Sequence, residues 1–174
     1  MRRTDREITD KRDIYGVLQK CDSLRLGINT QDYPYIVPLN YGVEFDGRSI
    51  TLWFHSATEG LKLDLIKRDP RVGFEADCSS SFLADEKACN CSTSYESVIG
   101  CGKISICRDD VSKLRGLKAI MRHYAPEGEF EFTKSELDTV CVLKLDVLQI
   151  TGKRRPVNAV PEINADNRRA CIGT

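Results

Sequence analysis

Apolar and polar residues alternate along six stretches of the chain, a period of two that is typical of β-strands with one buried face. These stretches are residues 24–28, 35–43, 50–54, 72–76, 99–106 and 141–147. Asp46-Gly47 separates the second and third stretches and is a hairpin signal. The apolar parity changes across Gly100 and Gly102, which predicts a bulge or a close backbone approach in the fifth strand.

Other stretches repeat their apolar positions with helical spacing. The first begins after a cap at residue 9 or 10 and reaches residue 21. The second begins after residue 60 and ends before Pro70, and the third runs from a cap at residue 109 or 110 to about residue 125. Residues 133–136 form a capping-box pattern for a fourth, short helix, whereas residues 79–94 are polar and are expected to form a loop.

This order of elements predicts a mainly β fold with flanking α-helices. A predominantly antiparallel sheet of six strands, mostly in hairpin order, closes most easily into a small barrel, with helices across its ends or its side. We expect one domain over residues 1–155 and a C-terminal tail over residues 156–174, where the sequence turns polar and irregular.

Composition narrows the classes of partner. The chain has 174 residues, and 26 lysines and arginines balance 26 acidic residues, so its charge gives no reason to expect nucleic acid or an anionic membrane as a partner. No window reaches the apolar length that crosses a bilayer. The first residues, MRRTDREITDKRD, lack the apolar stretch of a signal peptide, and we expect a cytoplasmic protein.

Eight cysteines raise the question of a metal site or disulfides. Cys101, Cys107 and Cys141 lie in strand patterns, where cysteine behaves as a small apolar residue. Cys78, Cys89 and Cys91 border the polar loop, but a closed zinc site needs four ligands and no CxxC pair is present. We expect free thiols and no metal.

The segment His55-Ser56-Ala57-Thr58-Glu59-Gly60, followed by Lys62, joins the third strand to a helix. Backbone N–H groups at a helix start, hydroxyl groups and an ammonium group together make a plausible anion site. The order of residues is not that of a P-loop. Two interpretations remain open from spacing: a phosphate site, or a histidine that bonds to backbone and a solvated lysine.

Five ordered fragments resemble one known family. They are YIVPLNYGVE, LWFHSATEGLKLDLIKRDPRVGFEAD, YESVIGCGKI, IMRHY and ITGKR. Together they resemble the nitroimidazole-resistance (Nim) family of the pyridoxamine 5′-phosphate oxidase-like superfamily. The resemblance covers about residues 1–155. It implies a six-stranded antiparallel split β-barrel that binds FMN, in a homodimer with two flavin sites at the subunit interface.

The resemblance also implies which residues hold the cofactor. The phosphate and ribityl chain would lie against Phe54, His55, Ser56 and Lys62. The isoalloxazine ring would lie along Val37, Pro38, Leu39 and Asn40, and the edge formed by Ser97, Val98, Ile99 and Gly100 could complete the pocket, including from the second subunit. His55 is the implied catalytic residue, which would orient or protonate a reduced intermediate; phosphate binding alone is its alternative role.

The function implied is that of an FMN-dependent oxidoreductase, which passes electrons from a reduced donor to a small acceptor such as a nitroaromatic. The alternative is a flavin- or haem-binding protein for storage, sensing or cofactor traffic, without catalysis. Only His55 and His123 could ligate a haem iron. Pyridoxamine 5′-phosphate oxidase activity is less favoured, because no separate basic cluster is evident for a second phosphate.

Overall fold

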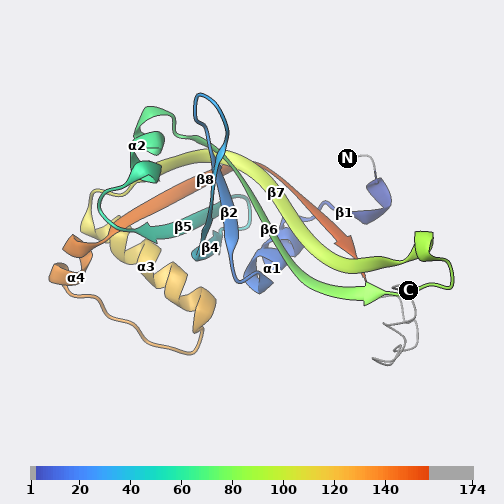
Figure 1. The fold of residues 1–174 in the computed structure, drawn as a ribbon. Coiled ribbons are helices and arrows are strands. Elements are labelled where there is room, and N and C mark those ends of the chain that lie inside the picture. The colour runs from blue at the N-terminus through green and yellow to red at the C-terminus, as the bar shows by residue number, and fades with distance from the viewer. Residues whose placement is uncertain (1–2, 157–174) are drawn as a thin grey trace, which may run out of the picture.

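The computed structural model describes residues 3–156. Figure 1 shows a curled sheet with helices at its sides and at one end. The strands are β1 (Glu7–Ile8), β2 (Leu24–Ile28), β3 (Tyr35–Leu39), β4 (Tyr41–Phe45), β5 (Ile50–Ser56), β6 (Arg71–Leu83), β7 (Ser92–Ile106) and β8 (Cys141–Arg155). The helices are α1 (Lys11–Lys20), α2 (Leu61–Arg68), α3 (Asp110–Tyr124) and α4 (Lys134–Thr139), with short 3₁₀ turns η1 (Thr4–Arg6) and η2 (Ala88–Asn90).

The strands form one antiparallel sheet in the order β3-β2-β6-β7-β8-β5-β4, and β1 pairs with β8. The two end strands, β3 and β4, are consecutive in the chain and are separated only by Asn40. The ends of the sheet are therefore brought together at one residue, which curls the sheet into the predicted split barrel. The stretch 35–43 was expected to be a single strand, but it divides at Asn40 because its two halves pair with different neighbours.

The predicted loop over residues 79–94 is wrong in extent. β6 continues to Leu83 and β7 begins at Ser92, so only the segment between them turns, and Figure 1 shows this pair extending beyond the rest of the sheet. The pairing runs from Ser81 opposite Ser94 to Leu83 opposite Ser92. Backbone hydrogen bonds build such a ladder without alternating apolar side chains, which is why the sequence pattern missed it.

A bulge is present at the predicted level of the sheet, but it lies in β8 and not in the predicted fifth strand, β7. Cys101 pairs with Gln149 and Gly102 pairs with Val147, so the extra residue is Leu148, on the neighbouring strand β8. At Gly100 a Cβ atom would lie 2.7 Å from the carbonyl oxygen of Gln149. This close backbone approach explains why the strand carries glycines here.

The main core lies inside the curled sheet. The helix α1 closes one end of it: the Asp10 side chain accepts from the N–H of Arg12, and Ile14, Val17 and Leu18 are buried. The Tyr41 hydroxyl, also buried, donates to the carbonyl of Leu18 and joins the helix to β4.

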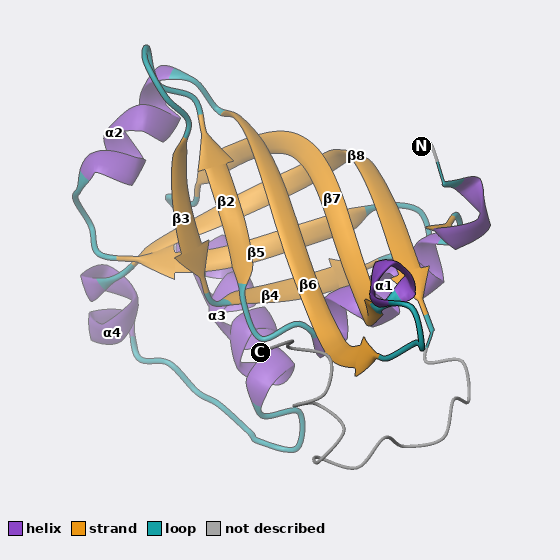
Figure 2. Ribbon diagram, turned by 45° about the vertical axis from the view of Figure 1, so that its right-hand side comes forward, coloured by secondary structure: helices purple, strands orange, loops and turns teal. Residues whose placement is uncertain are grey.

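A second, smaller core lies on the outer surface of β4, β5 and β8, where α3 covers the sheet (Figure 2). Trp53 is its largest side chain and is 2 % exposed. Glycines allow the helix to lie close to the strands. A Cβ atom at Gly42 would lie 2.6 Å from the Ala119 carbonyl oxygen, and one at Gly116 would lie 2.6 Å from Cγ1 of Val142.

The four predicted helices are confirmed, with caps at Asp10 and Asp109 and a complete capping box between Thr133 and Glu136. Among the described residues, no helix is both long and apolar enough to cross a membrane. The expected tail lies outside the described residues from residue 157 onward.

The cysteines occupy different environments. Cys107 and Cys141 are buried as predicted, but Cys101 is exposed because it has the outward-facing parity of Ile99 and Lys103 in β7. The seven cysteines of residues 3–156 are free thiols, and that part of the chain holds no group of three or more metal-ligating side chains.

Candidate functional site

The end of β5 carries three of the predicted cofactor residues. The strand continues to Ser56, so His55 lies within it, opposite Val142 of β8, rather than at the start of a loop. Successive strand side chains point to opposite faces, and therefore His55 is exposed while Phe54 and Ser56 are buried. The structure places the imidazole and the Ser56 hydroxyl on opposite faces of the sheet.

The start of α2 follows Ser56 after four residues. Gly60 is the N-cap residue, with φ +132°, and no side chain caps the helix. The N–H groups of Leu63 and Asp64 bond to the Gly60 carbonyl, at 2.9 and 3.3 Å, whereas those of Leu61 and Lys62 have no bond within the helix. This end of α2 therefore presents two N–H groups, the positive end of the helix dipole and a lysine.

The strand β3 supplies the second group of predicted residues. It is an end strand of the sheet, so one of its edges has no strand partner among the described residues and presents backbone N–H and C=O groups. The side chains of Val37 and Leu39 are half-buried, and those of Pro38 and Asn40 are exposed.

The structure brings these two groups of residues together. The β4–β5 ladder ends where Tyr41 pairs with Phe54. Asn40 directly precedes Tyr41 and His55 directly follows Phe54, so both lie at this end of the ladder. We call the segments 37–40, 54–56 and 60–62 the β3–β5 corner.

The third group, residues 97–100, does not meet the corner within one chain. Pro38 pairs with Arg25, Arg25 with Glu75, and Glu75 with Ile99, so these four residues form one row across β3, β2, β6 and β7. Three strand spacings separate Pro38 from Ile99, about 14 Å. Val98 is fully buried, so its side chain belongs to the core, whereas Ile99 is 61 % exposed.

The outer surface between the two groups is partly apolar and uncovered. Ile36, Ile99 and Leu148 are 65, 61 and 66 % exposed. Gly27 and Gly73 lie in the same row as Ile36, which leaves this part of the sheet flat. We call this surface the open face.

A charged cluster borders the open face. The Arg25 guanidinium lies 3.2 Å from the Glu75 carboxylate and 2.5 Å from that of Asp77. Burial raises the pKa of Glu75, and the neighbouring Asp77 carboxylate raises it further, against the opposite effect of Arg25. Glu75 therefore takes up a proton at a higher pH than an ordinary glutamate does.

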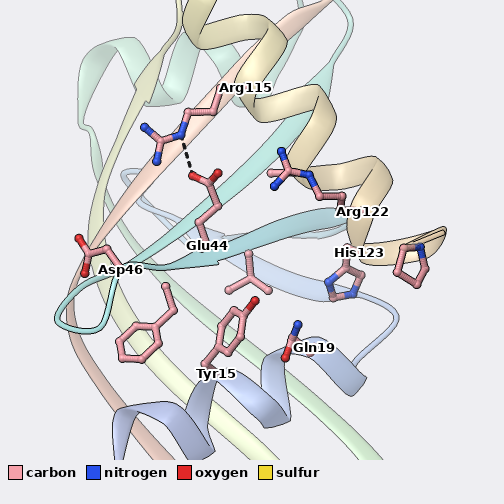
Figure 3. Close-up of a pocket in the computed structure, with 11 residues that line it drawn as sticks. Tyr15, Gln19, Glu44, Asp46, Arg115, Arg122 and His123 are labelled. Atoms are coloured by element: carbon pink, nitrogen blue, oxygen red, sulfur yellow. Dashed lines mark hydrogen bonds and ion pairs between the residues drawn. The ribbon is translucent and has the colours of Figure 1, made fainter. Parts of the chain in front are cut away.

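A cavity of about 460 Å³ lies elsewhere, between α1, β4 and α3 (Figure 3). It is lined by none of the predicted flavin-site residues, but His123, the second candidate haem ligand, is part of its lining. The spacing of Arg115, Ala119 and Arg122 along one side of α3 is a sequence signal for a helix face with two cations and a small residue between them. That signal carries no information about β4, which forms the floor of the cavity, or about α1, which forms the opposite wall.

Comparisons with known proteins agree with this fold. The family model described as pyridoxamine 5′-phosphate oxidase matches residues 10–154. A proposed 5-nitroimidazole antibiotic resistance protein from Bacteroides thetaiotaomicron is 32% identical in sequence. Its structure superposes with a TM-score of 0.74, over 85% of this chain and 86% of that chain. A search of curated protein sequences gives no match.

Two more distant structures share the fold. The flavocytochrome Anf3 from Azotobacter vinelandii has a TM-score of 0.77 at 15% identity, over 98% of this chain and 77% of that chain. An FAD and haem binding protein from Mycobacterium smegmatis has a TM-score of 0.76 at 17% identity, over 97% of this chain and 81% of that chain.

Proposed function

The chain belongs to the pyridoxamine 5′-phosphate oxidase family, and from this we propose that it is an FMN-dependent oxidoreductase that passes electrons to a small acceptor such as a nitroaromatic. The observation that carries the proposal is the β3–β5 corner. There a free strand edge and an exposed imidazole lie at one end of the β4–β5 ladder, and an uncapped helix start follows β5 after four residues. The name of the 32%-identical relative supports a nitroaromatic acceptor.

The residues of the corner fit the parts of FMN. The N–H groups of Leu61 and Lys62 and the ammonium of Lys62 would hold the phosphate, as helix starts commonly do. The free edge of β3 would bond to the polar edge of the ring, because strand edges present alternating donors and acceptors. When bound, the flavin supplies the redox chemistry of the site.

His55 is proposed as the residue that acts on the substrate. Its imidazole is exposed on the outer face beside Val142, so it can donate a proton to, or orient, a molecule lying against β5. Ser56 points to the opposite face, and its contribution to the cofactor is therefore proposed through its backbone and the turn into α2 rather than beside the imidazole.

A homodimer is part of the proposal. Residues 97–100 lie about 14 Å from β3 in the same chain, so they would complete a flavin pocket more readily from a second subunit. The open face supports this arrangement, since exposed Ile36, Ile99 and Leu148 would be covered by a second copy.

The test is the absorption spectrum of the purified protein, followed by acid release and identification of the chromophore. We expect FMN. Lys62→Ala should weaken FMN binding about tenfold, because it removes a charge-assisted contact to phosphate. The matched control is Lys67→Ala on the same helix, whose ammonium pairs with Asp64 at 3.3 Å. Equal FMN affinity of the two variants would contradict the phosphate site.

His55→Ala should lower turnover with a nitroaromatic acceptor more than it lowers FMN affinity. Unchanged turnover would remove His55 from the catalytic role.

A non-catalytic haem- or flavin-binding protein is the second candidate, and the names of two structural neighbours favour it. His123 is poorly placed as a haem ligand, because its Nε2 lies 3.0 Å from the Cys21 carbonyl and its ring lies between Tyr41 and Tyr124. A haem would therefore need His55. A Soret band that disappears in His55→Ala would select this candidate over the oxidoreductase, and release of FAD would correct the choice of flavin.

A further inference from the structure

The cavity beside β4 shares no lining residue with the β3–β5 corner. Two residues of α1, Tyr15 and Gln19, form one wall, and α3 forms the other with Arg115, Ala119 and Arg122. In Figure 3 the strand β4 crosses between the two helices. At about 460 Å³, the cavity is within the size range of small-molecule sites.

The floor of the cavity is the free edge of a strand. β4 is the last strand of the sheet, so its outer edge has no strand partner among the described residues. The N–H of Tyr41 donates to the Tyr124 hydroxyl at 3.1 Å, which shows that Tyr41 directs its backbone away from β5. In an antiparallel ladder every second residue does the same, so Val43 and Phe45 direct their N–H and C=O groups into the cavity.

The charged groups are separated along this edge. Arg122 has no ion-pair or hydrogen-bond partner within residues 3–156, and it lies between Glu44 and His123 in Figure 3, with Asp46 at the far end. The Arg115 Nε donates to the Glu44 carboxylate at 2.9 Å, and Trp53 Nε1 donates to the same oxygen, which leaves the second oxygen of Glu44 without a bond. The edge therefore offers the unpaired guanidinium of Arg122 and the second oxygens of Glu44 and Asp46. Arg115 already binds Glu44, and the N–H groups of Arg48 and Ser49 bind the first oxygen of Asp46.

Apolar surface lies between these charges. The rings of Tyr15 and Phe45 lie 5.7 Å apart at 32°, and Ala119 and Pro126 add small apolar groups. The small side chain of Ala119 keeps the space between the two arginines open.

We propose that this cavity binds an extended dipeptide with a free amino group and a free carboxylate. The peptide amide pairs with the backbone edge at Val43, the carboxylate binds the Arg122 guanidinium, and the ammonium group lies toward Glu44 and Asp46. An apolar side chain packs against Tyr15 and Phe45. Addition of a short strand to an open sheet edge is a common mode of peptide recognition. The inference does not depend on flavin binding at the corner.

The test is titration of the full chain with the dipeptide Ala-Phe, followed by backbone amide NMR. From the usual binding energy per ligand atom, we expect saturation with a Kd of about 0.2 mM. The largest shifts should be those of the Val43 and Phe45 amides. Ala-Phe carboxamide, which lacks the carboxylate, should bind about tenfold more weakly because it loses the charge-assisted bond to Arg122.

Substitutions test the contribution of the Arg122 guanidinium to binding. Arg122→Gln should weaken Ala-Phe binding about tenfold and leave the affinity for the carboxamide unchanged, because only the acid uses Arg122. Arg108→Gln, at an exposed position just before α3, is the matched control and should bind like the parent chain. Gln19→Trp, at the exposed rim, should block both ligands without altering the core.

Three results would overturn the proposal: no saturable shift at about 10 mM Ala-Phe, equal affinity for the acid and the carboxamide, or shifts centred on His55 and α2 instead of β4. The comparison of the two ligands on the unaltered chain needs no variant, so a variant that fails to fold leaves the test intact.

Discussion

One sheet has two outer surfaces in this protein, and they differ in what covers them. On β4, β5 and β8 the helix α3 buries Trp53 and Val142 to 2 % and 0 % exposure. On the open face Ile36 and Ile99 remain more than half exposed. Both surfaces carry large apolar side chains, so alternation alone does not distinguish a covered surface from an open one. What differs is whether the chain itself supplies a covering element.

The largest predicted contrast is in monomer stability. Trp53→Ala should lower the free energy of unfolding by about 4 kcal/mol, because it removes a large buried ring from the second core. Ile99→Ala should change it by no more than about 0.5 kcal/mol, as is usual for exposed positions. Urea denaturation at a protein concentration where the chain is monomeric measures both. Similar losses in the two variants would mean that the open face is buried in the monomer as well.

A charge on the open face tests whether a second copy covers it. Ile99→Lys should raise the dimer dissociation constant about a hundredfold, because a symmetric interface would bury the charge twice. Sedimentation equilibrium measures the constant. Lys103→Glu is a control at the far end of the same strand, exposed and outside the apolar rows. If Ile99→Lys and the parent chain have the same mass at all concentrations, the dimer is not formed through this surface.

The two surfaces of the sheet also predict opposite effects of pH at two carboxyl groups. Glu96 lies on the inner side of the sheet, and burial alone would raise its pKa. Its ion pairs with Lys20, at 2.7 Å, and with Arg154 outweigh the effect of burial, so the pKa of Glu96 is lowered. A lowered pKa adds stability above the unfolded value, near 4.3, and this stability is lost as the pH falls through the folded pKa.

Glu75, on the outer face, has a raised pKa, so its contribution is present below the unfolded value and is lost as the pH rises. At pH 7, Glu96→Gln should therefore destabilise the protein, by about 2 kcal/mol, whereas Glu75→Gln should stabilise it slightly. Unfolding free energies from pH 3 to pH 7 measure both effects, and the same sign for the two variants would contradict this account.

The smallest contrast is between two glycines. Gly116→Ala should cost about 1–2 kcal/mol net, because overpacking against Trp53 and Val142 exceeds the gain in helix propensity. At Gly73, on the open face, the nearest atom to an added Cβ lies 3.8 Å away, so Gly73→Ala should be neutral or slightly stabilising. Thermal unfolding of the two variants measures the difference. A neutral Gly116→Ala would show that α3 can move away from the sheet at little cost.

Much of the architecture was predictable because its signals are local. Asp10 and Thr133 cap helices through atoms only two or three residues away, and Pro70 ends α2 through its immediate neighbour. The bulge was predicted in the wrong strand, because outward-facing Ile99 and Cys101 resemble a parity change in β7, whereas the extra residue is Leu148 of β8. The extension of β6 and β7 was not predictable from the sequence. Their polar ends pair through backbone hydrogen bonds, which leave no pattern of apolar side chains.

The sequence by itself determined the four helices, most of the strands, the family and the residue types available to a site at 54–62. Only the tertiary structure decided that the chain divides at Asn40, so that β3 and β4 each keep a free edge. It also decided that His55 and Ser56 face opposite ways and that α1 and α3 enclose the edge at Val43. The physical reason is that local dihedral preferences and caps act within a few residues, whereas strand edges and cavities arise from pairing between segments far apart in the chain.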